Sequence, residues 1–417
     1  MPSISEPETT VYRCPDEAYA ISPAIHLGRL ASFYPKCRQC PHRDETGTLS
    51  TGVVKMLALA RRRIVVGSLF TEEGVAGVYS NELSPVETRQ FAASFGVYLA
   101  RRSADPLGAV ALAGDGRALA PELVAAASDG LRWAGCKVVD LGAATAASLA
   151  WAIEHLQAAG GLLVGNPSGE ANTVGLKLWG AAGRPISAGA ELQAIQALCE
   201  RGVDRPTRAY GALARFQAEQ LYLAGLQEFY HALRPLRFVL DTGCRPLVGY
   251  FRRLATAVAC QMLLCREAAQ GPAAGALNLA DRVIAERAHF GVWIDGDGEA
   301  CRFVDERGAN LTAEQMLLLA ARNLTSRQAG ATIVLEQGTS RATVERLTAA
   351  GARVVVSEPS RAAMDAAMRE SRAIFGGGAS GRFWHGGRRP MADGLKTLSL
   401  VLTILSQSDR PFSSVLS

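Results

Sequence analysis

Apolar residues recur in two alternating patterns along most of this chain. Short apolar runs, such as residues 109–113, 161–164 and 331–335, have the length and the flanking turns of buried strands. Between such runs, apolar residues recur at helical spacing, as in residues 121–134 and 144–159. Strands that alternate with helices predict an α/β protein whose sheets are mixed but mainly parallel, with helices packed on their faces.

The strand–helix–strand pattern recurs three times, so we expect three tandem α/β domains. Their expected ranges are 63–205, 206–310 and 311–417. The first domain should open with a strand at residues 63–67, and residues 188–233 read as a helical connection. Residues 1–62 precede these domains as a polar extension with little periodicity.

Composition and charge narrow the class of protein. Hydrophobic residues make up 48% and charged residues 20%, which is typical of a globular chain. The formal charge of +5 comes from scattered arginines and forms no basic face with aromatic partners, so no nucleic-acid interface is expected. No apolar run reaches bilayer length, and the start of the chain is polar and acidic. These features predict a cytoplasmic protein without a membrane span and with reduced cysteines.

Three of the nine cysteines lie close together near the start of the chain. Cys37 and Cys40 form a C-x-x-C pair, and Cys14 could be a third ligand of one tetrahedral ion. His26 or His42 could be the fourth. A structural Zn²⁺ would stabilise a segment that lacks a core of its own, as in a zinc knuckle. A redox pair and three unrelated thiols are the alternatives.

An acidic loop follows the predicted strand at residues 291–294. Asp295, Asp297 and Glu299 alternate with glycines, and carboxylates in this arrangement can point at one hard cation such as Mg²⁺. The loop lies at the carboxyl end of its strand, where ligands of open α/β sheets bind. A solvated acidic turn is the alternative.

Three further loops lie at such strand ends. The Gly-rich run at 376–381 exposes backbone N–H groups that can form an anion nest. Lys177 follows the loop at 165–170 and could contact phosphate or carry a proton, or could be a surface lysine. Arg117 ends the turn at 114–117 and could bind phosphate, or belong to a simple turn.

These loops, in this order, resemble those of the α-D-phosphohexomutases, the family of phosphoglucomutase and phosphomannomutase. The resemblance covers residues 64 to 417. The matching segments are 74–78 with 83–85 for the G-I-R-G loop, 115–117 for the D-x-R turn, 175–178 for the N-G-I-K strand, 295–297 for the start of the D-G-D-x-D-R loop, 375–381 for the sugar-binding G-G-E-x-S-G-H loop, and 393–394 for the following D-G.

The resemblance implies the family's phosphoryl transfer through a phosphoserine. Mg²⁺ would bridge that serine and the acidic loop. Lys177 and Arg117 would take catalytic positions, and Gly377, Ser380 and Arg382 would bind the sugar phosphate. A fourth domain holds the distal phosphate in the family, and we expect it to be absent from this chain, through evolved loss or truncation.

The chain departs from the family at the positions that carry the chemistry. Counted back from the lysine strand without a gap, Pro167 takes the phosphoserine position, and Ser168 follows it. A shift of one residue would make Ser168 the phosphoacceptor. The other replacements are Ala76 for Arg, Glu299 for the third Asp, Ala300 for Arg, Gly378 for Glu and Arg382 for His.

Three hypotheses of function follow. The leading one is a pseudoenzyme that keeps sugar-phosphate or divalent-metal binding, or that binds a partner protein. The second is an active Mg²⁺-dependent phosphoryl-transfer enzyme that uses Ser168. The third is a scaffold without a small ligand. The sequence does not indicate an oligomeric state.

Overall fold

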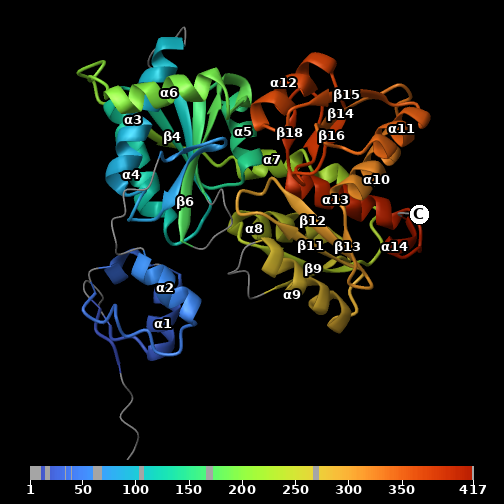
Figure 1. Ribbon diagram of the computed structural model, residues 1–417, viewed down its shortest axis with the longest axis horizontal. Coiled ribbons are helices and arrows are strands. Elements are labelled where there is room, and N and C mark those ends of the chain that lie inside the picture. The colour runs from blue at the N-terminus through green and yellow to red at the C-terminus, as the bar shows by residue number, and fades with distance from the viewer. Residues whose placement is uncertain are drawn as a thin grey trace, which may run out of the picture.

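A computed structural model describes residues 11–14, 19–32, 34–38, 40–59, 68–102, 108–165, 172–265 and 272–415. Figure 1 shows three α/β lobes and a small helical part near the N-terminus. Each lobe is built around one sheet with both parallel and antiparallel pairs. The predicted α/β class with mixed sheets is therefore confirmed. The strand expected at 63–67 lies outside the described residues.

The first lobe contains an eight-stranded sheet in the order β1-β2-β6-β5-β3-β4-β8, with β7 paired to β6. Its strands are β1 (Phe70–Thr71), β2 (Gly74–Val78), β3 (Ala109–Gly114), β4 (Lys137–Ala143), β5 (Gly160–Gly165), β6 (Thr173–Gly180), β7 (Pro185–Ile186) and β8 (Leu213–Arg215). β8 corrects the prediction of a purely helical connection at 188–233. It is a three-residue edge strand with exposed ends, too short to produce a strand pattern in the sequence.

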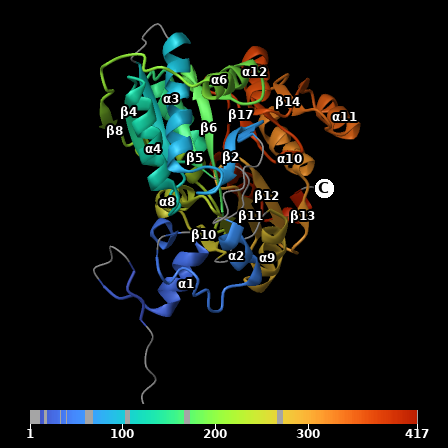
Figure 2. The same ribbon diagram turned by 60° about the vertical axis from the view of Figure 1, so that its left-hand side comes forward.

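Helices cover both faces of this sheet because β3 alternates its side chains. Val110 and Leu112 pack in one cluster with α3 (Pro85–Arg102), α4 (Ala120–Trp133) and α6 (Ala190–Arg201). Ala111 and Ala113 pack on the other side with α5 (Ala146–His155). Figure 2 shows α3 and α4 running side by side in front of the sheet. Their close approach requires Gly130, where a Cβ would lie 2.2 Å from the carbonyl oxygen of Arg89.

The second lobe has a five-stranded sheet in the order β10-β9-β11-β12-β13. Its elements are α7 (Glu219–Ala224), β9 (Arg237–Thr242), α8 (Arg245–Leu254), β10 (Gln261–Leu264), α9 (Pro272–Ala285), β11 (Phe290–Ile294), β12 (Cys301–Asp305) and β13 (Asn310–Leu311). Phe238 on β9 stacks on Phe290 on β11 with ring centroids 5.1 Å apart. Phe412, near the end of the chain, packs edge-on against Phe290, so the last residues close this core.

The third lobe has the sheet order β15-β14-β16-β17-β18. Its elements are α10 (Ala313–Thr325), β14 (Thr332–Glu336), α11 (Arg341–Ala349), β15 (Arg353–Ser357), α12 (Arg361–Ser371), β16 (Phe375–Gly377), β17 (Trp384–His385), β18 (Met391–Ala392), α13 (Gly394–Ser406) and α14 (Phe412–Val415). α13 shares one continuous core with the second lobe, and Tyr222 on α7 donates to both oxygens of Asp393 at its start. The second and third lobes are thus joined through a common core.

The N-terminal part contains α1 (Pro23–Ala31), a short 3-10 turn at Pro35–Arg38 and α2 (Thr51–Leu59). Ser22 caps α1, since its side chain accepts from the backbone of Ile25. In the part of the chain that the structure describes, no helix has the length and apolar character needed to cross a membrane.

Candidate functional site

The acidic loop is the tight turn between β11 and β12. The backbone N–H of Asp295 donates to Ala300, and the N–H of Gly298 donates to Asp295. Gly298 has φ +79°, a left-handed conformation that favours glycine. The Oδ1 of Asp295 accepts from the N–H of Glu299 at 2.7 Å. Asp295 therefore serves to shape the turn, which leaves the other two acids to face outward from it.

Main-chain hydrogen bonds hold this loop against both neighbouring lobes. The N–H of Ala146, at the start of α5, donates to the carbonyl of Asp297 at 2.9 Å. The N–H of Gly394, at the start of α13, donates to the carbonyl of Gly298 at 2.8 Å. The loop thus lies where the three lobes meet.

Lys177 on β6 reaches the acidic loop from the first lobe. Its Nζ lies 2.6 Å from Oδ2 of Asp297 and 2.8 Å from Oε2 of Glu299. All three side chains are almost fully buried, with at most 5% of each exposed. The predicted surface-lysine alternative is therefore wrong, because Lys177 bridges two buried carboxylates.

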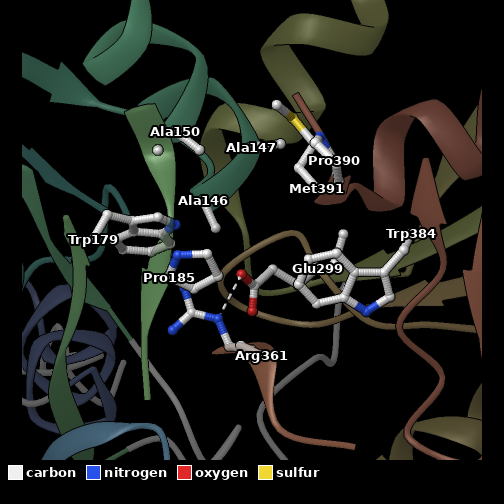
Figure 3. A pocket seen from close by; sticks show the side chains of 12 residues that line it. Ala146, Ala147, Ala150, Trp179, Pro185, Glu299, Arg361, Trp384, Pro390 and Met391 are labelled. Carbon is white, nitrogen blue, oxygen red and sulfur yellow. Dashed lines mark ion pairs between the residues drawn. The ribbon is translucent and has the colours of Figure 1, made fainter. Parts of the chain in front are cut away.

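Two arginines reach the same loop from the third lobe. The Nε of Arg361, the first residue of α12, lies 3.2 Å from Oε1 of Glu299, as Figure 3 shows. Its guanidinium also lies over the ring of Trp179, 4.4 Å from the centroid, in cation–π contact. Arg382 places Nη1 3.0 Å from Glu73 and Nε 3.6 Å from Glu299. Glu299 thus contacts cations from two lobes.

The charges of this network shift one another's pKa values. Burial alone would raise the pKa of Glu299, but the charges of Arg361, Lys177 and Arg382 outweigh it and lower that pKa to about 2. Burial would lower the pKa of Lys177, but the facing carboxylates raise it. Burial raises the pKa of Asp295 to about 6, against the opposing charge of Lys177. Lys177 and Glu299 are therefore both charged at neutral pH.

Asp115 and Arg117 form a second, smaller pair at the end of β3. The Nε of Arg117 lies 2.5 Å from Oδ2 of Asp115, and its Nη1 donates to the carbonyl of Thr173 at 3.0 Å. Burial raises the pKa of Asp115, against the lowering effect of Arg117. A mainly apolar hollow of about 430 Å³ adjoins Arg117. These contacts tie Arg117 to its own turn and to β6.

The loop that carries Pro167 and Ser168 lies outside the described residues, which stop at 165 and resume at 172. Gly165, the last described residue before this loop, ends β5. A Cβ on Gly165 would lie 2.3 Å from Oδ1 of Asp297, so the chain leaves β5 directly beside the acidic loop. The base of this loop and the acidic loop therefore meet at one place.

The Gly-rich loop at 376–381 is held from below by Glu336. The backbone N–H of Ser380 donates to this carboxylate at 2.9 Å, and its hydroxyl donates to the other oxygen. A Cβ on Gly378 would lie 2.5 Å from the Cβ of Glu336, so only glycine fits there. Gly377 lies at the end of β16, and Arg382 follows the loop into the charge network. The structure thus brings Arg382 to the acidic loop and keeps Ser380 bonded to Glu336.

Three residues of this site were missed by sequence reasoning: Glu73, Glu336 and Arg361. Glu336 ends the strand β14, a strand-end position that could have drawn attention to it. Glu73 lies in the β1–β2 turn and Arg361 begins a helix, and neither belongs to a recognisable motif. Their roles depend on how the lobes pack.

The fit of the acidic loop to Mg²⁺ can be judged from these contacts. Asp297 and Glu299 direct carboxylate oxygens at the ammonium of Lys177, and Asp295 directs one at its own turn. In the described part of the chain, no three His, Cys, Asp or Glu side chains form a group that could hold a metal ion. The three acids lie on one loop as predicted, and Oδ1 of Asp297 has no hydrogen-bond partner among the described residues, but with Lys177 between Asp297 and Glu299 they do not converge on a divalent ion.

The N-terminal cysteines divide between two clusters. Cys14 and Cys40 pack with Ile21, while Cys37 packs in a different apolar cluster. His26 lies within hydrogen-bond distance of the Glu45 carbonyl, 3.0 Å from Nε2, and His42 pairs with the Glu45 carboxylate at 2.8 Å. Among the described residues, these side chains form no group of three that could hold a metal ion. The zinc prediction is not confirmed.

Comparison with known proteins places the chain in a family. The sequence model for "Phosphoglucomutase/phosphomannomutase, alpha/beta/alpha domain I" matches residues 67–204, and the one for domain III matches residues 312–417. The chain belongs to the α-D-phosphohexomutase superfamily. The phosphomannomutase/phosphoglucomutase of Pseudomonas aeruginosa is 27% identical over 327 residues, which are 74% of this chain and 68% of that protein.

A second relative and a solved structure are also similar to this chain. The phosphomannomutase of Escherichia coli is 27% identical over 291 residues, or 64% of this chain and 63% of that protein. A crystal structure of a phosphoglucomutase/phosphomannomutase family protein from Burkholderia thailandensis superposes with a TM-score of 0.75 at 24% identity, covering 84% of this chain and 80% of that one. That likeness confirms the fold of the superfamily for most of the chain.

Proposed function

We propose that this phosphohexomutase-like chain binds a hexose phosphate where its three lobes meet and does not turn it over as a mutase. The observation that carries the proposal is the position of Lys177, which contacts both Asp297 and Glu299 within a buried network. Phosphoryl transfer depends almost entirely on positioning and charge stabilisation. Acids that are already neutralised by protein cations have less to contribute to such a reaction.

The residues near the expected nucleophile support the same proposal. Pro167 takes the phosphoserine position and has no nucleophilic group. The loss of one electrostatic donor from such a site typically costs about a hundredfold or more in rate. Ala76, Ala300 and Gly378 stand where the family has Arg, Arg and Glu. With several such groups replaced together, we expect little mutase activity.

Two largely buried arginines support binding of an anionic ligand. Arg361 is 1% exposed, and its Nη1 and Nη2 have no hydrogen-bond partner among the described residues. Arg382 reaches the same network beside the Gly-rich loop. Guanidinium groups match phosphate oxygens in geometry and charge. Relatives of this chain are named as mutases of phosphorylated hexoses, which suggests the ligand class.

Active phosphoryl transfer through Ser168 is the second candidate. The observation that favours it is the course of the chain, which leaves β5 at Gly165 directly against Asp297. Ser168 follows Gly165 by three positions in the sequence, and Mg²⁺ at the acidic loop would have to displace Lys177 from Asp297 and Glu299. A scaffold that binds only a partner protein is the third candidate.

Two measurements separate these candidates. The first is titration of the purified chain with glucose 1-phosphate, mannose 1-phosphate and their 6-phosphates, with inorganic phosphate as control, followed by calorimetry. We expect hexose-phosphate binding stronger than phosphate binding. If none of these compounds gives a heat of binding, the third candidate, a scaffold that binds only a partner protein, is favoured.

The second measurement is incubation with glucose 1,6-bisphosphate and Mg²⁺, followed by peptide mass spectrometry and a coupled mutase assay. We expect neither a phosphopeptide nor turnover. Stoichiometric phosphoserine at Ser168, with turnover abolished by Ser168→Ala, would overturn the proposal in favour of the active enzyme.

A further inference from the structure

We propose that the ammonium group of Lys177 is the built-in counter-cation of the acidic loop, so that this site excludes divalent metals unless Lys177 is removed. The inference concerns the metal requirement of the site and does not depend on which ligand the chain binds. It rests on the geometry of Lys177 and of the two arginines beside it.

The position of Lys177 leaves no room for a second cation between the acids. Its Nζ lies 2.6 Å from Asp297 and 2.8 Å from Glu299, so one ammonium joins the two carboxylates. An ammonium offers three donors and no acceptor. A divalent ion that took up the same two oxygens would have to lie almost where Nζ lies.

The backbone of Lys177 is fixed, so the side chain has little freedom to withdraw. It is part of β6, where it pairs with Leu163 of β5 in an antiparallel ladder. On the opposite edge, the preceding residue, Leu176, pairs with Val75 of β2. The lysine side chain is 4% exposed. Withdrawal would place an unpaired ammonium in a buried environment, which is costly.

The cations that contact Glu299 are matched in number by the carboxylates that they contact. Three cations, Lys177, Arg361 and Arg382, contact three carboxylates, those of Glu73, Asp297 and Glu299. These six groups sum to zero net charge, and the buried carboxyl of Asp295 beside them, which accepts from the N–H of Glu299, adds one negative charge above its pKa of about 6. A divalent ion would add two positive charges beside three cations where water is excluded and screening is weak. The cations also occupy both oxygens of Glu299, since Arg361 lies at Oε1 and Lys177 at Oε2.

Replacement of Lys177 should convert this arrangement into a metal site. Lys177→Met removes the ammonium, keeps a side chain of similar length, frees Oδ2 of Asp297, and leaves Oε2 of Glu299 with Nε of Arg382 at 3.6 Å. Carboxylate oxygens are the ligands that Mg²⁺ and Mn²⁺ prefer. The variant would then carry an excess of buried negative charge that a divalent ion relieves.

Mn²⁺ titration followed by electron paramagnetic resonance tests the proposal, since bound Mn²⁺ loses the sharp signal of the free ion. The full chain should leave millimolar Mn²⁺ free, and Lys177→Met should bind about one ion per chain at least tenfold more tightly. The double variant Lys177→Met with Asp297→Asn should lose that ion. Lys137→Met, which removes an exposed lysine from β4, should behave as the unchanged chain does.

The unchanged chain alone can overturn the proposal if the variant fails to fold. Stoichiometric submillimolar Mn²⁺ binding that Asp297→Asn removes would show that the metal competes successfully with the lysine. Lys177→Gln provides a second replacement that keeps a hydrogen-bond donor toward Asp297. A folded Lys177→Met or Lys177→Gln chain that gains no metal affinity would also contradict the proposal.

Discussion

Glu299→Gln is the most informative single substitution, because it removes one charge and keeps the size of the side chain. In the folded protein the pKa of Glu299 is lowered from 4.5 to about 2, as burial is outweighed by Arg361, Lys177 and Arg382. Lowering this pKa from 4.5 to about 2 corresponds to about 3 kcal/mol of interaction in favour of the charged form. We expect the variant to lose about that much stability at pH 7.

The pH dependence of this loss has a defined sign. A carboxyl group whose pKa is depressed by folding contributes stability above its unfolded pKa and loses it as the pH falls through the folded value. The stability difference between the unchanged chain and Glu299→Gln should therefore be full above pH 4.5 and shrink toward pH 2. Three cations left with fewer partners would add to the cost near neutrality.

Urea and thermal unfolding from pH 3 to pH 8 would measure the effect. A loss of about 3 kcal/mol lowers Tm by roughly 6–12 °C in a cooperative unit of 150–250 residues. Glu345→Gln is the matched control, because its pair with Arg341 is exposed on both sides and should contribute less than about 1 kcal/mol. A Glu299→Gln chain as stable as this control at every pH would refute the reasoning about the network.

Further predictions concern Asp241, Gly165 and the N-terminal cysteines. Burial raises the pKa of Asp241 to about 6, so ionisation of this carboxyl destabilises the folded chain as the pH rises from 3.8 through 6. Asp241→Asn should therefore stabilise the chain by about 1–2 kcal/mol at pH 8, but not at pH 4, as measured by urea unfolding. Gly165→Ala should lower stability by about 1–3 kcal/mol, because its Cβ would strike Asp297, whereas Gly249→Ala, whose Cβ meets nothing within 4 Å, should be neutral or stabilising in the same thermal assay. Metal analysis should show less than stoichiometric zinc, since the described residues form no group of three metal-ligating side chains. About one zinc per chain that is lost in Cys37→Ser would restore the zinc interpretation.

The fold was predictable because it depends on patterns that are local in the sequence. Buried strands such as β3 and β5 contain apolar runs of five and four residues, at 109–113 and 161–164, and the helices beside them show helical spacing. The edge strand β8 escaped notice because it has three residues and buries little. The order of loops at strand ends then indicated the superfamily.

The site was predictable only in part, because its decisive contacts join distant segments. Lys177 and the acids were each singled out as candidates near strand ends, but only the structure shows their direct contact. Arg361 lies 62 positions beyond Glu299 in the sequence and on another lobe, so no local pattern links them. The use of the loop acids as partners for arginines depends on lobe packing, which sequence periodicity does not describe.

The main-chain hydrogen bonds from Ala146 and Gly394 to the acidic loop have a consequence for how such a site can change over time. Every residue except proline supplies the same N–H and C=O groups, so these bonds survive most replacements of the loop's side chains. The loop can therefore exchange its acids and neighbours while its place between three lobes stays the same. A scaffold fixed in this way can lose one chemistry and acquire another without first losing its shape.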